Sequence, residues 1–175
     1  MRLERVTSAA HPMYTQAMAL YKKSFPPYEQ RETPSQERIL GDGDYNFAPV
    51  CDGKLFVGLA LYRETAEYLY IEHFYIRQAL RNHRYGQRTL DLLAECGKTL
   101  ILEIDPPMDA IVCRRKMFYE RCGFAENPFP HIHPPYHAEN HGHALVVMTY
   151  PLPITQEKYN DFYRYLTEKV MKDVF

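Results

Sequence analysis

The feature of the sequence that most constrains the fold is a change in hydrophobic period between residues 74 and 93. Before it, residues 45–76 contain three short runs rich in aromatic and β-branched residues, separated by tight turns, and this pattern predicts an antiparallel meander. After it, Leu90, Leu93 and Ala94 recur at helical spacing, and another strand pattern follows. The sequence therefore predicts a mixed α/β domain that starts with antiparallel strands and continues through a strand–helix–strand crossover.

The other segments extend this alternation of helices and strands. We expect helices at residues 11–25, 34–40, 79–97, 110–124 and 154–175, and strands at residues 45–50, 55–64, 65–76, 98–107 and 143–152. Thr155 is expected to cap the last helix. The apolar stripe of that helix is interpreted as a packing face or, alternatively, as a dimer surface, and it comprises Tyr159, Phe162, Leu166 and Val170.

The composition excludes several classes of protein. The 175-residue chain has 21 basic and 22 acidic residues, so its formal net charge of −1 gives no basis for general binding to nucleic acid or anionic membranes. No apolar segment reaches the length of about 18 residues that a membrane span needs, and the N-terminus lacks a signal-peptide pattern. The four cysteines have no CxxC spacing, which is typical of free thiols in a reducing compartment. We therefore expect a soluble, cytoplasmic, single-domain protein.

The turn that opens the crossover helix is basic and contains a glycine. Residues 77–88 include four arginines, and they lead into a helix start, where backbone N–H groups point outward and the helix dipole adds partial positive charge. Such a turn is suited to bind a pyrophosphate. Basic helix starts are also common as solvated surface, so local physics alone leaves both interpretations open.

The segment RNHRYG, residues 81–86, resembles the acyl-CoA pyrophosphate loop of the GNAT superfamily of N-acetyltransferases. Arg84 stands where that loop has its first glycine, but a residue with α-helical dihedrals still presents its N–H group. In the family, the preceding strand offers backbone groups to pantetheine. The resemblance implies acetyl-CoA as cofactor, bound by Phe74, Tyr75, Ile76, Arg81, Asn82, His83, Arg84, Tyr85, Gly86 and Gln87.

A second segment, MFYERCGF at residues 117–124, resembles the FYxxxGF motif of the same family. The tyrosine of that motif lies near the cofactor sulfur, so the resemblance implies Tyr119 as the general acid that protonates the leaving thiolate. The alternative is an aromatic packing residue. Val112 occupies the position at which many family members have an asparagine that contacts pantetheine.

Two further segments are similar to acceptor-side loops of bacterial GNAT members. One is SFPPYEQRE, residues 24–32, at the exit of the first helix, and the other is PPY, residues 134–136, before the last strand. In the family these connections line the acceptor site. The resemblance therefore implies Phe25, Glu29, Tyr136 and His137 as substrate-binding residues.

The resemblance covers residues 1–150 and implies a GNAT acyl-CoA N-acyltransferase fold, with a mixed, mostly antiparallel central sheet flanked by helices. Residues 151–175 are expected to form an extra C-terminal helix packed on the same domain. The implied activity is direct transfer of an acetyl group from acetyl-CoA to the primary amine of a small molecule, and a homodimer is compatible with it. Two alternatives stay open: a protein N-acetyltransferase, and a non-catalytic acyl-CoA-binding protein with the same fold.

Direct transfer needs a base for the acceptor amine. Glu72 lies two residues before Phe74 on the expected strand, so a period of two places both side chains on one face and makes Glu72 the first candidate. Glu103 on the neighbouring strand and His137 are alternative proton acceptors, because carboxylates and imidazoles are both common general bases. Both glutamates are equally compatible with a polar role on a partly solvated sheet face.

The run HIHPPYHAENHGH, residues 131–143, contains five of the eight histidines. Its spacing matches no zinc pattern and it contains no cysteine, so we predict no metal site. The run is interpreted as a wall of the acceptor site or as a polar loop without a role. A metal-binding module built on these histidines is the remaining alternative.

Overall fold

The structure, a computed structural model, describes residues 1–172 and 174. The chain forms two compact units, of which the first comprises Met1–Pro27 and Gln36–Leu100 and the second Tyr28–Ser35 and Ile101–Phe175. The chain therefore passes between the units after Pro27, after Ser35 and after Leu100. The second passage lies within helix α2 (Thr33–Ile39) and the third within strand β5 (Thr99–Ile104).

The first unit contains antiparallel strands in the order β1, β2, β3, β4. Their bounds are β1 (Arg2–Leu3), β2 (Tyr45–Asp52), β3 (Leu55–Glu64) and β4 (Tyr68–Ile76). Asp52 pairs with Leu55 across a tight turn, in which Gly53 takes the left-handed φ of 59° that such turns favour. The meander predicted for residues 45–76 is confirmed, whereas β1 has no counterpart in the sequence prediction.

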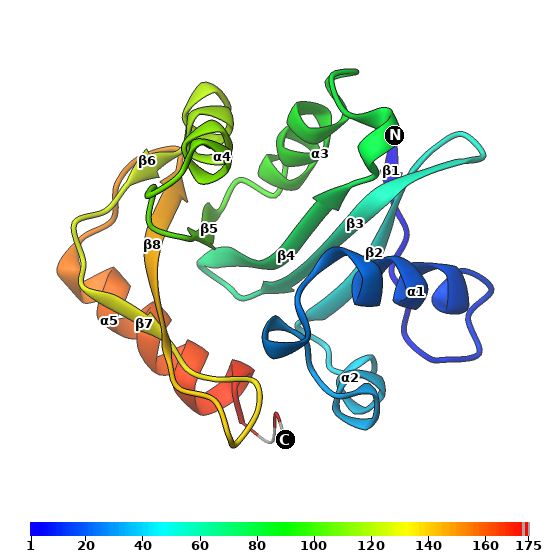
Figure 1. Cartoon of the computed structure of the whole chain (residues 1–175), viewed down its shortest axis with the longest axis horizontal. Helices are drawn as coiled ribbons and strands as arrows, with labels where there is room; N and C mark the ends of the chain where they lie inside the picture. Colours follow the sequence, from blue (N-terminus) through cyan, green and yellow to red (C-terminus); the bar gives the residue numbers. More distant parts are fainter. Residues whose placement is uncertain (173, 175) are drawn as a thin grey trace. The chain divides into compact units, whose positions relative to one another are not determined.

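Two helices of the first unit, α1 (Tyr14–Ser24) and α3 (Tyr85–Ala94), lie on opposite sides of these strands (Figure 1). The apolar side chains of α1 fall on one helical stripe and join a buried cluster with residues of β2 and β3. In this cluster the ring of Tyr21 meets Phe47 edge-on, with ring centroids 6.3 Å apart. The contact holds the C-terminal end of α1 in a fixed place on the sheet.

The crossover helix starts later than the sequence predicts. Gln78–Leu80 form a single 3-10 turn (η2), and α3 begins only at Tyr85. Between them the backbone is left-handed at Asn82, with a φ of 67°, and at Arg84, with a φ of 59°. A right-handed helix cannot continue through left-handed residues, so the predicted start at residue 79 is wrong and residues 81–84 form a loop.

Strand β8 (His143–Tyr150) is the central strand of the second unit. It neighbours β5 and pairs antiparallel with β6 (Ala125–Glu126) and β7 (His131–His133). The two late strands of the sequence prediction are thereby confirmed. The very short strands β6 and β7 are not among the predicted ones.

Helix α4 (Ala110–Arg121) has well-defined ends. Its cap is Asp109, whose carboxylate accepts hydrogen bonds from the N–H groups of Ile111 at 2.7 Å and Val112 at 2.9 Å. It ends just before Gly123, whose φ of 86° is typical of a glycine that stops a helix. The predicted helix at residues 110–124 is confirmed.

Helix α5 (Gln156–Tyr165) forms the first part of the predicted C-terminal helix. Thr155 caps it as predicted, because its hydroxyl accepts from the N–H group of Lys158 at 3.3 Å. A π-helical turn (η3, Leu166–Val170) follows, so the predicted uninterrupted α-helix is wrong, and residues 173 and 175 at its end lie outside the described residues. The predicted apolar stripe is buried throughout, as expected of a packing face.

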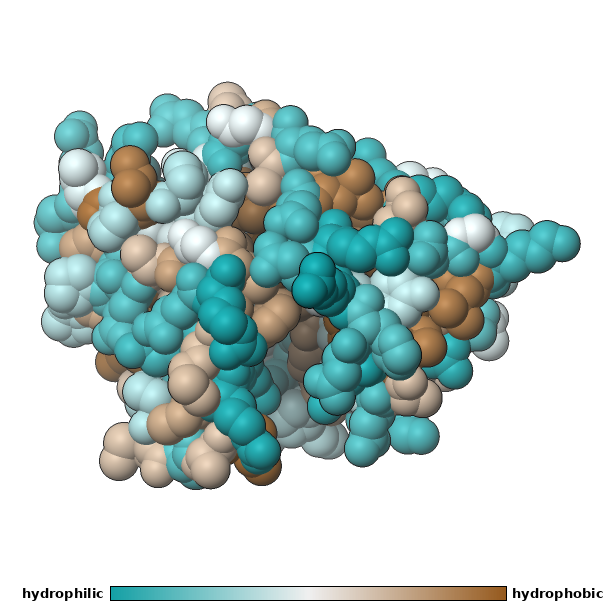
Figure 2. Space-filling view, turned by 90° about the horizontal axis from the view of Figure 1, so that it is seen from above, coloured by the Kyte–Doolittle hydropathy of each residue, from teal (hydrophilic) through white to brown (hydrophobic). Residues whose placement is uncertain are grey.

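The architecture is thus a mixed, mostly antiparallel sheet with flanking helices and a C-terminal helix, which confirms the predicted fold class. The face drawn in Figure 2 is largely hydrophilic, with apolar residues in small groups. Among the described residues, no helix is both long and apolar enough to span a bilayer.

Candidate active site

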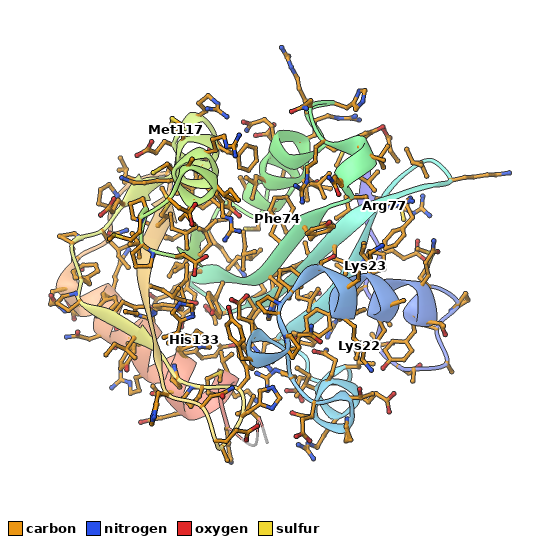
Figure 3. The ribbon with its side chains drawn as sticks, in the orientation of Figure 1. Lys22, Lys23, Phe74, Arg77, Met117 and His133 are labelled. Carbon is orange, nitrogen blue, oxygen red and sulfur yellow. The ribbon has the colours of Figure 1, made fainter. Side chains whose placement is uncertain are left out.

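The end of β4 leads directly into the predicted cofactor loop. Phe74 on the strand and Arg77 just after it mark this exit in Figure 3. A Cβ atom on Gly58 of β3 would lie 2.1 Å from the carbonyl oxygen of Tyr75, so only glycine allows the two backbones to approach so closely. Strand β3 therefore fixes the backbone of β4 up to the start of the loop.

The loop of residues 81–84 ends at an open helix start. Arg84 is the N-cap residue of α3, and no side chain among the described residues caps the helix. The first intrahelical bond runs from the N–H group of Arg88 to the carbonyl of Arg84 at 3.0 Å, so the N–H groups of residues 85–87 have no intrahelical partner. Together with the positive end of the helix dipole, these donors form a site for an anion.

The backbone of Arg84 is not in the α-helical conformation that was expected from the sequence. Its φ of 59° and ψ of 11° are left-handed, not α-helical. This conformation costs a residue other than glycine roughly 1–2 kcal/mol. The chain therefore keeps a backbone geometry that favours glycine although the residue is an arginine.

Three of the four arginines near this helix start are held by other groups. The contacts are Arg77 to the carbonyl of Phe56 at 2.9 Å, Arg81 to the carbonyl of Ile76 at 3.2 Å, and Arg88 to the carboxylate of Asp52 at 3.3 Å. Arg84, in contrast, has no side-chain hydrogen bond or ion pair with any described residue. Its guanidinium group is available to an anionic ligand, while the other three stiffen the loop.

Glu72 is the extra residue of a β-bulge in β4. The pairing with β3 passes from Leu61–His73 to Tyr62–Ile71 and skips Glu72. The bulge interrupts the alternation of the strand, so the argument that Glu72 shares a face with Phe74 does not hold. The carboxylate of Glu72 accepts from Nε of Arg63 at 3.0 Å, and both side chains are only 1% exposed. Its role as base stays a prediction.

Phe25, at the exit of α1, packs against residues in the C-terminal half of strand β4. Its ring lies 4.6 Å from that of His73 and 6.2 Å from that of Tyr75, both edge-on. The structure thus brings a predicted acceptor residue and a predicted cofactor residue together within the first unit.

Tyr119 lies on α4 in the second unit. Its ring packs edge-on against Phe124, with centroids 5.7 Å apart. Burial raises the pKa of the Tyr119 hydroxyl to about 12, so the phenol keeps its proton at neutral and moderately alkaline pH. The protonated phenol is the form that a general acid requires.

Glu29, Asp105 and His143 form a polar cluster in the second unit. Glu29 lies on the 3-10 turn η1 (Pro27–Glu29), Asp105 follows β5, and His143 begins β8. One ligand atom of each lies within 4.8 Å of the others, and Nε2 of His143 is 3.4 Å from Asp105. Among the described residues, this is the group whose geometry would admit a metal ion.

Two features of this cluster bear on what it can bind. Burial raises the pKa of Glu29, and the nearby charge of Asp105 raises it further. Arg115 pairs with Asp105 at 3.1 Å, and its positive charge opposes a divalent ion. The same charge opposes a singly charged cation less strongly than a divalent one.

The structure divides the histidine run. His131 and His133 are buried on β7, and His133 is labelled in Figure 3. The ring of His133 stacks on Tyr136 with centroids 5.1 Å apart. Nδ1 of His137 lies 4.0 Å from the carboxylate of Glu32. The run is thus part strand and part loop, and its members have different surroundings.

Comparison with known proteins decides the family. The family model of the acetyltransferase (GNAT) family matches residues 10–124. The chain belongs to the acetyltransferase (GNAT) family. A GNAT-family protein of known structure from Bacteroides thetaiotaomicron is 28% identical to it, with a TM-score of 0.91 over 98% of each chain.

More distant solved structures of acetyltransferases share the fold. An aminoglycoside 6′-N-acetyltransferase complexed with coenzyme A is 14% identical, with a TM-score of 0.57 over 89% of this chain and 100% of its own. The ribosomal-protein-S18-alanine N-acetyltransferase from Escherichia coli is 15% identical, with a TM-score of 0.55 over 89% of this chain and 96% of its own. Such low identities show the fold alone. No curated protein sequence matches the chain.

As a GNAT enzyme, the chain is an acetyltransferase that uses acetyl-CoA. The first unit suits this cofactor, because its uncapped N–H groups and the guanidinium of Arg84 all favour anionic oxygens. All ten predicted cofactor residues lie in this unit, as do Glu72 and Phe25. The other predicted residues lie in the second unit: Tyr119, Glu29, Tyr136 and His137.

Some polar residues that the structure brings together are not among the predicted site residues. Asp105 directly follows a strand, and this position was an available signal. The contact of His131 with Tyr159 joins residues 28 positions apart, and no local sequence pattern predicts such a contact.

Proposed function

We propose that this GNAT enzyme transfers an acetyl group directly from acetyl-CoA to the primary amine of a small molecule. The observation that carries the proposal is the open start of α3, which follows β4 and has the unpaired guanidinium of Arg84 beside it. A helix start of this kind favours a pyrophosphate.

The cofactor residues take distinct parts in this proposal. The N–H groups of Tyr85, Gly86 and Gln87 bind the pyrophosphate together with Arg84, and Arg81, Asn82 and His83 shape the loop. The backbone groups of Phe74, Tyr75 and Ile76 bind the pantetheine arm, since Gly58 keeps that backbone in place. Each part follows from the resemblance, and the local geometry supports it.

The polar cluster of the second unit supports an amine acceptor. The carboxylates of Glu29 and Asp105 attract a cation, and Tyr28 stands beside His143 with ring centroids 6.5 Å apart. Tyr136 and His137 are proposed to contact the rest of the acceptor. A small amine with one or more positive charges is the substrate class that such a cluster favours.

The acceptor ammonium loses a proton, the neutral nitrogen forms a bond to the thioester carbonyl carbon, and the carbon–sulfur bond breaks. The thiolate that leaves takes a proton from Tyr119, whose raised pKa keeps the hydroxyl protonated until then. The nitrogen of the new amide loses its second proton, which balances the proton that Tyr119 gives and restores its hydroxyl.

The test is an acetylation assay with acetyl-CoA and a panel of amines that includes aminoglycosides, polyamines and peptides with free N-termini or lysines. We expect coenzyme A release and acetylated product with small amines, and intersecting initial-rate lines, as direct transfer requires. Parallel lines would contradict direct transfer. Activity confined to peptides would replace the small amine by a protein acceptor, and acetyl-CoA binding without turnover of any amine would favour the non-catalytic alternative.

A further inference from the structure

A buried network in the second unit joins Glu103 of β5, His131 and His133 of β7, and Tyr159 of α5. Nε2 of His131 is hydrogen-bonded to Oε1 of Glu103, and Nε2 of His133 lies 3.9 Å from Oε2 of the same carboxylate. The side chains of Glu103, His131 and His133 are 6%, 0% and 7% exposed. Two imidazole rings thus face the two oxygens of one buried carboxylate, and we call these four residues the Glu103 network.

His131 can hold one proton or two without losing a hydrogen bond. Its Nδ1 lies 3.0 Å from the hydroxyl of Tyr159, and that hydroxyl also lies 3.1 Å from the carbonyl of Pro130. When the ring is neutral, Tyr159 donates to Nδ1 and the Nε2–H group donates to Glu103. When the ring is charged, Nδ1–H donates to the hydroxyl oxygen, and the hydroxyl hydrogen turns to Pro130.

The two ring nitrogens of His133 have different neighbours. Its Nδ1 lies 2.6 Å from the carbonyl oxygen of Pro134, which only accepts hydrogen bonds, so Nδ1 carries the proton of the neutral ring. Nε2 is therefore unprotonated in the neutral ring and faces Glu103. A proton that binds there forms an ion pair with the carboxylate.

Tyrosine and charged side chains from several elements surround the network. Tyr163 of α5 lies beside His131, with centroids 5.6 Å apart, and its hydroxyl donates to the carbonyl of Ile132 at 3.2 Å. Asp105, two residues beyond Glu103, is paired with Arg115 and His143. Tyr136 stacks on His133, and the guanidinium of Arg31 lies 5.8 Å from the centre of the Tyr136 ring.

We infer that the Glu103 network, and not the ion-paired Glu72, is the proton acceptor of the acetyl transfer. The proton lost by the acceptor ammonium goes to Nε2 of His133, where the carboxylate of Glu103 stabilises the imidazolium. His131 and Tyr159 hold that carboxylate in place. This inference rests on the proposed function. The N–H bond of the ammonium breaks, its electron pair becomes the lone pair that attacks the thioester, and the proton stays in the network until solvent removes it. The contact of His133 with Tyr136, a proposed acceptor residue, supports this order.

The first experiment measures kcat against pH for Glu103→Gln and His133→Gln. Glutamine keeps the size of Glu103 and one acceptor oxygen, but it lacks the negative charge that stabilises a charged His133. We expect kcat at pH 7 to fall about 100-fold, with unchanged affinity for acetyl-CoA. The loss should shrink as the pH rises towards the pKa of the acceptor amine, about 10 for an alkyl amine, because the amine is then already neutral. His141→Gln and Glu139→Gln, both exposed in the same loop, are the matched controls and should keep the wild-type profile.

Two outcomes of this experiment would overturn the inference while the proposed function stands. One is a Glu103→Gln enzyme with the wild-type kcat at pH 7. The other is a loss of the same size at every pH, which indicates a structural role and no proton transfer.

The second experiment observes the imidazole nitrogens by NMR in the wild type and in Glu103→Gln. We expect the neutral ring of His133 to carry its proton on Nδ1, and we expect Nε2 of His133 to be the atom that takes up a proton when the ring becomes charged. A His133 ring that takes up no proton at Nε2 would overturn the inference. If the wild type acetylates no amine, the catalytic role fails together with the proposed function, and the NMR result still decides whether the network takes up a proton.

Discussion

Mutation of Arg84 can separate the effect of its side-chain charge on cofactor binding from the effect of its backbone conformation on stability. Arg84→Gly removes the guanidinium group but suits the left-handed φ of 59°. We expect the Kd for coenzyme A to rise about tenfold, since a hydrogen bond to a charged group contributes roughly 1.5 kcal/mol. The free energy of unfolding should change by less than about 1 kcal/mol, because relief of the left-handed strain offsets the entropy cost of glycine. Calorimetric titration and urea unfolding measure the two quantities.

The control for this variant is Lys158→Ala, which removes an exposed positive charge on α5. It should leave both the Kd and the unfolding free energy unchanged. An unchanged Kd in Arg84→Gly would show that the cofactor phosphates do not bind at the start of α3.

Tyr119 offers a prediction about pH as well as rate. Tyr119→Phe should bind acetyl-CoA normally and lose about 100-fold in kcat, because the leaving thiolate has lost its proton donor. In the wild type the protonated hydroxyl is the active form, and it is lost only as the pH rises through its pKa of about 12. The wild-type kcat should therefore show no alkaline decline due to Tyr119 below about pH 10. Tyr62→Phe on β3 is the control, and a Tyr119→Phe enzyme with normal kcat would contradict the assignment.

Residue types were easier to predict than their conformations and partners. The motifs identified the segment around Arg84 and pointed to Tyr119, because both follow from contiguous sequence. The left-handed backbone of Arg84 and the ion pair of Glu72 with Arg63 did not follow, since one bulge in β4 changes which side chains meet. Long-range partners such as His131 and Glu103 depend on strand order, which a local pattern does not contain.

At the scale of elements, the predictions were good wherever a long run of apolar residues had clear ends. Strand β3 was predicted with both of its ends, at residues 55–64, because its apolar run lies between two turns. Strands β1, β6 and β7 have only two or three residues, too few for a two-residue period to be recognised. The π-helical turn after α5 was also missed, since the apolar stripe runs on through it.

The cap of α5 provides a test at this scale. Thr155→Ala removes the hydroxyl that accepts from the N–H group of Lys158. We expect a loss of about 1 kcal/mol in the free energy of unfolding, which lowers Tm by roughly 2–4 °C for a chain of this size. Thr155→Ser keeps the hydroxyl and should keep most of the stability. Equal losses in the two variants would mean that the methyl group of Thr155, and not the cap, provides the stabilisation.

At the scale of the whole molecule, the path of the chain predicts that the two compact units unfold together. The chain passes between them three times, once within α2 and once within β5. Residues 28–35 belong to the second unit although the segments on both sides belong to the first. Neither unit can therefore unfold without breaking a helix or a strand that continues into the other.

The effect of acetyl-CoA on thermal unfolding tests whether the two units unfold together. All proposed cofactor residues lie in the first unit, so binding stabilises that unit directly, and the second only if the two unfold as one. At a cofactor concentration 100 times the Kd, we expect about 2.7 kcal/mol of added stability and a single calorimetric transition that moves up by roughly 5–10 °C. Arg84→Gly at the same concentration should gain only about half as much, because its Kd is about tenfold higher. Two separate transitions, of which acetyl-CoA shifts only one, would show that the units unfold independently despite their shared helix and strand.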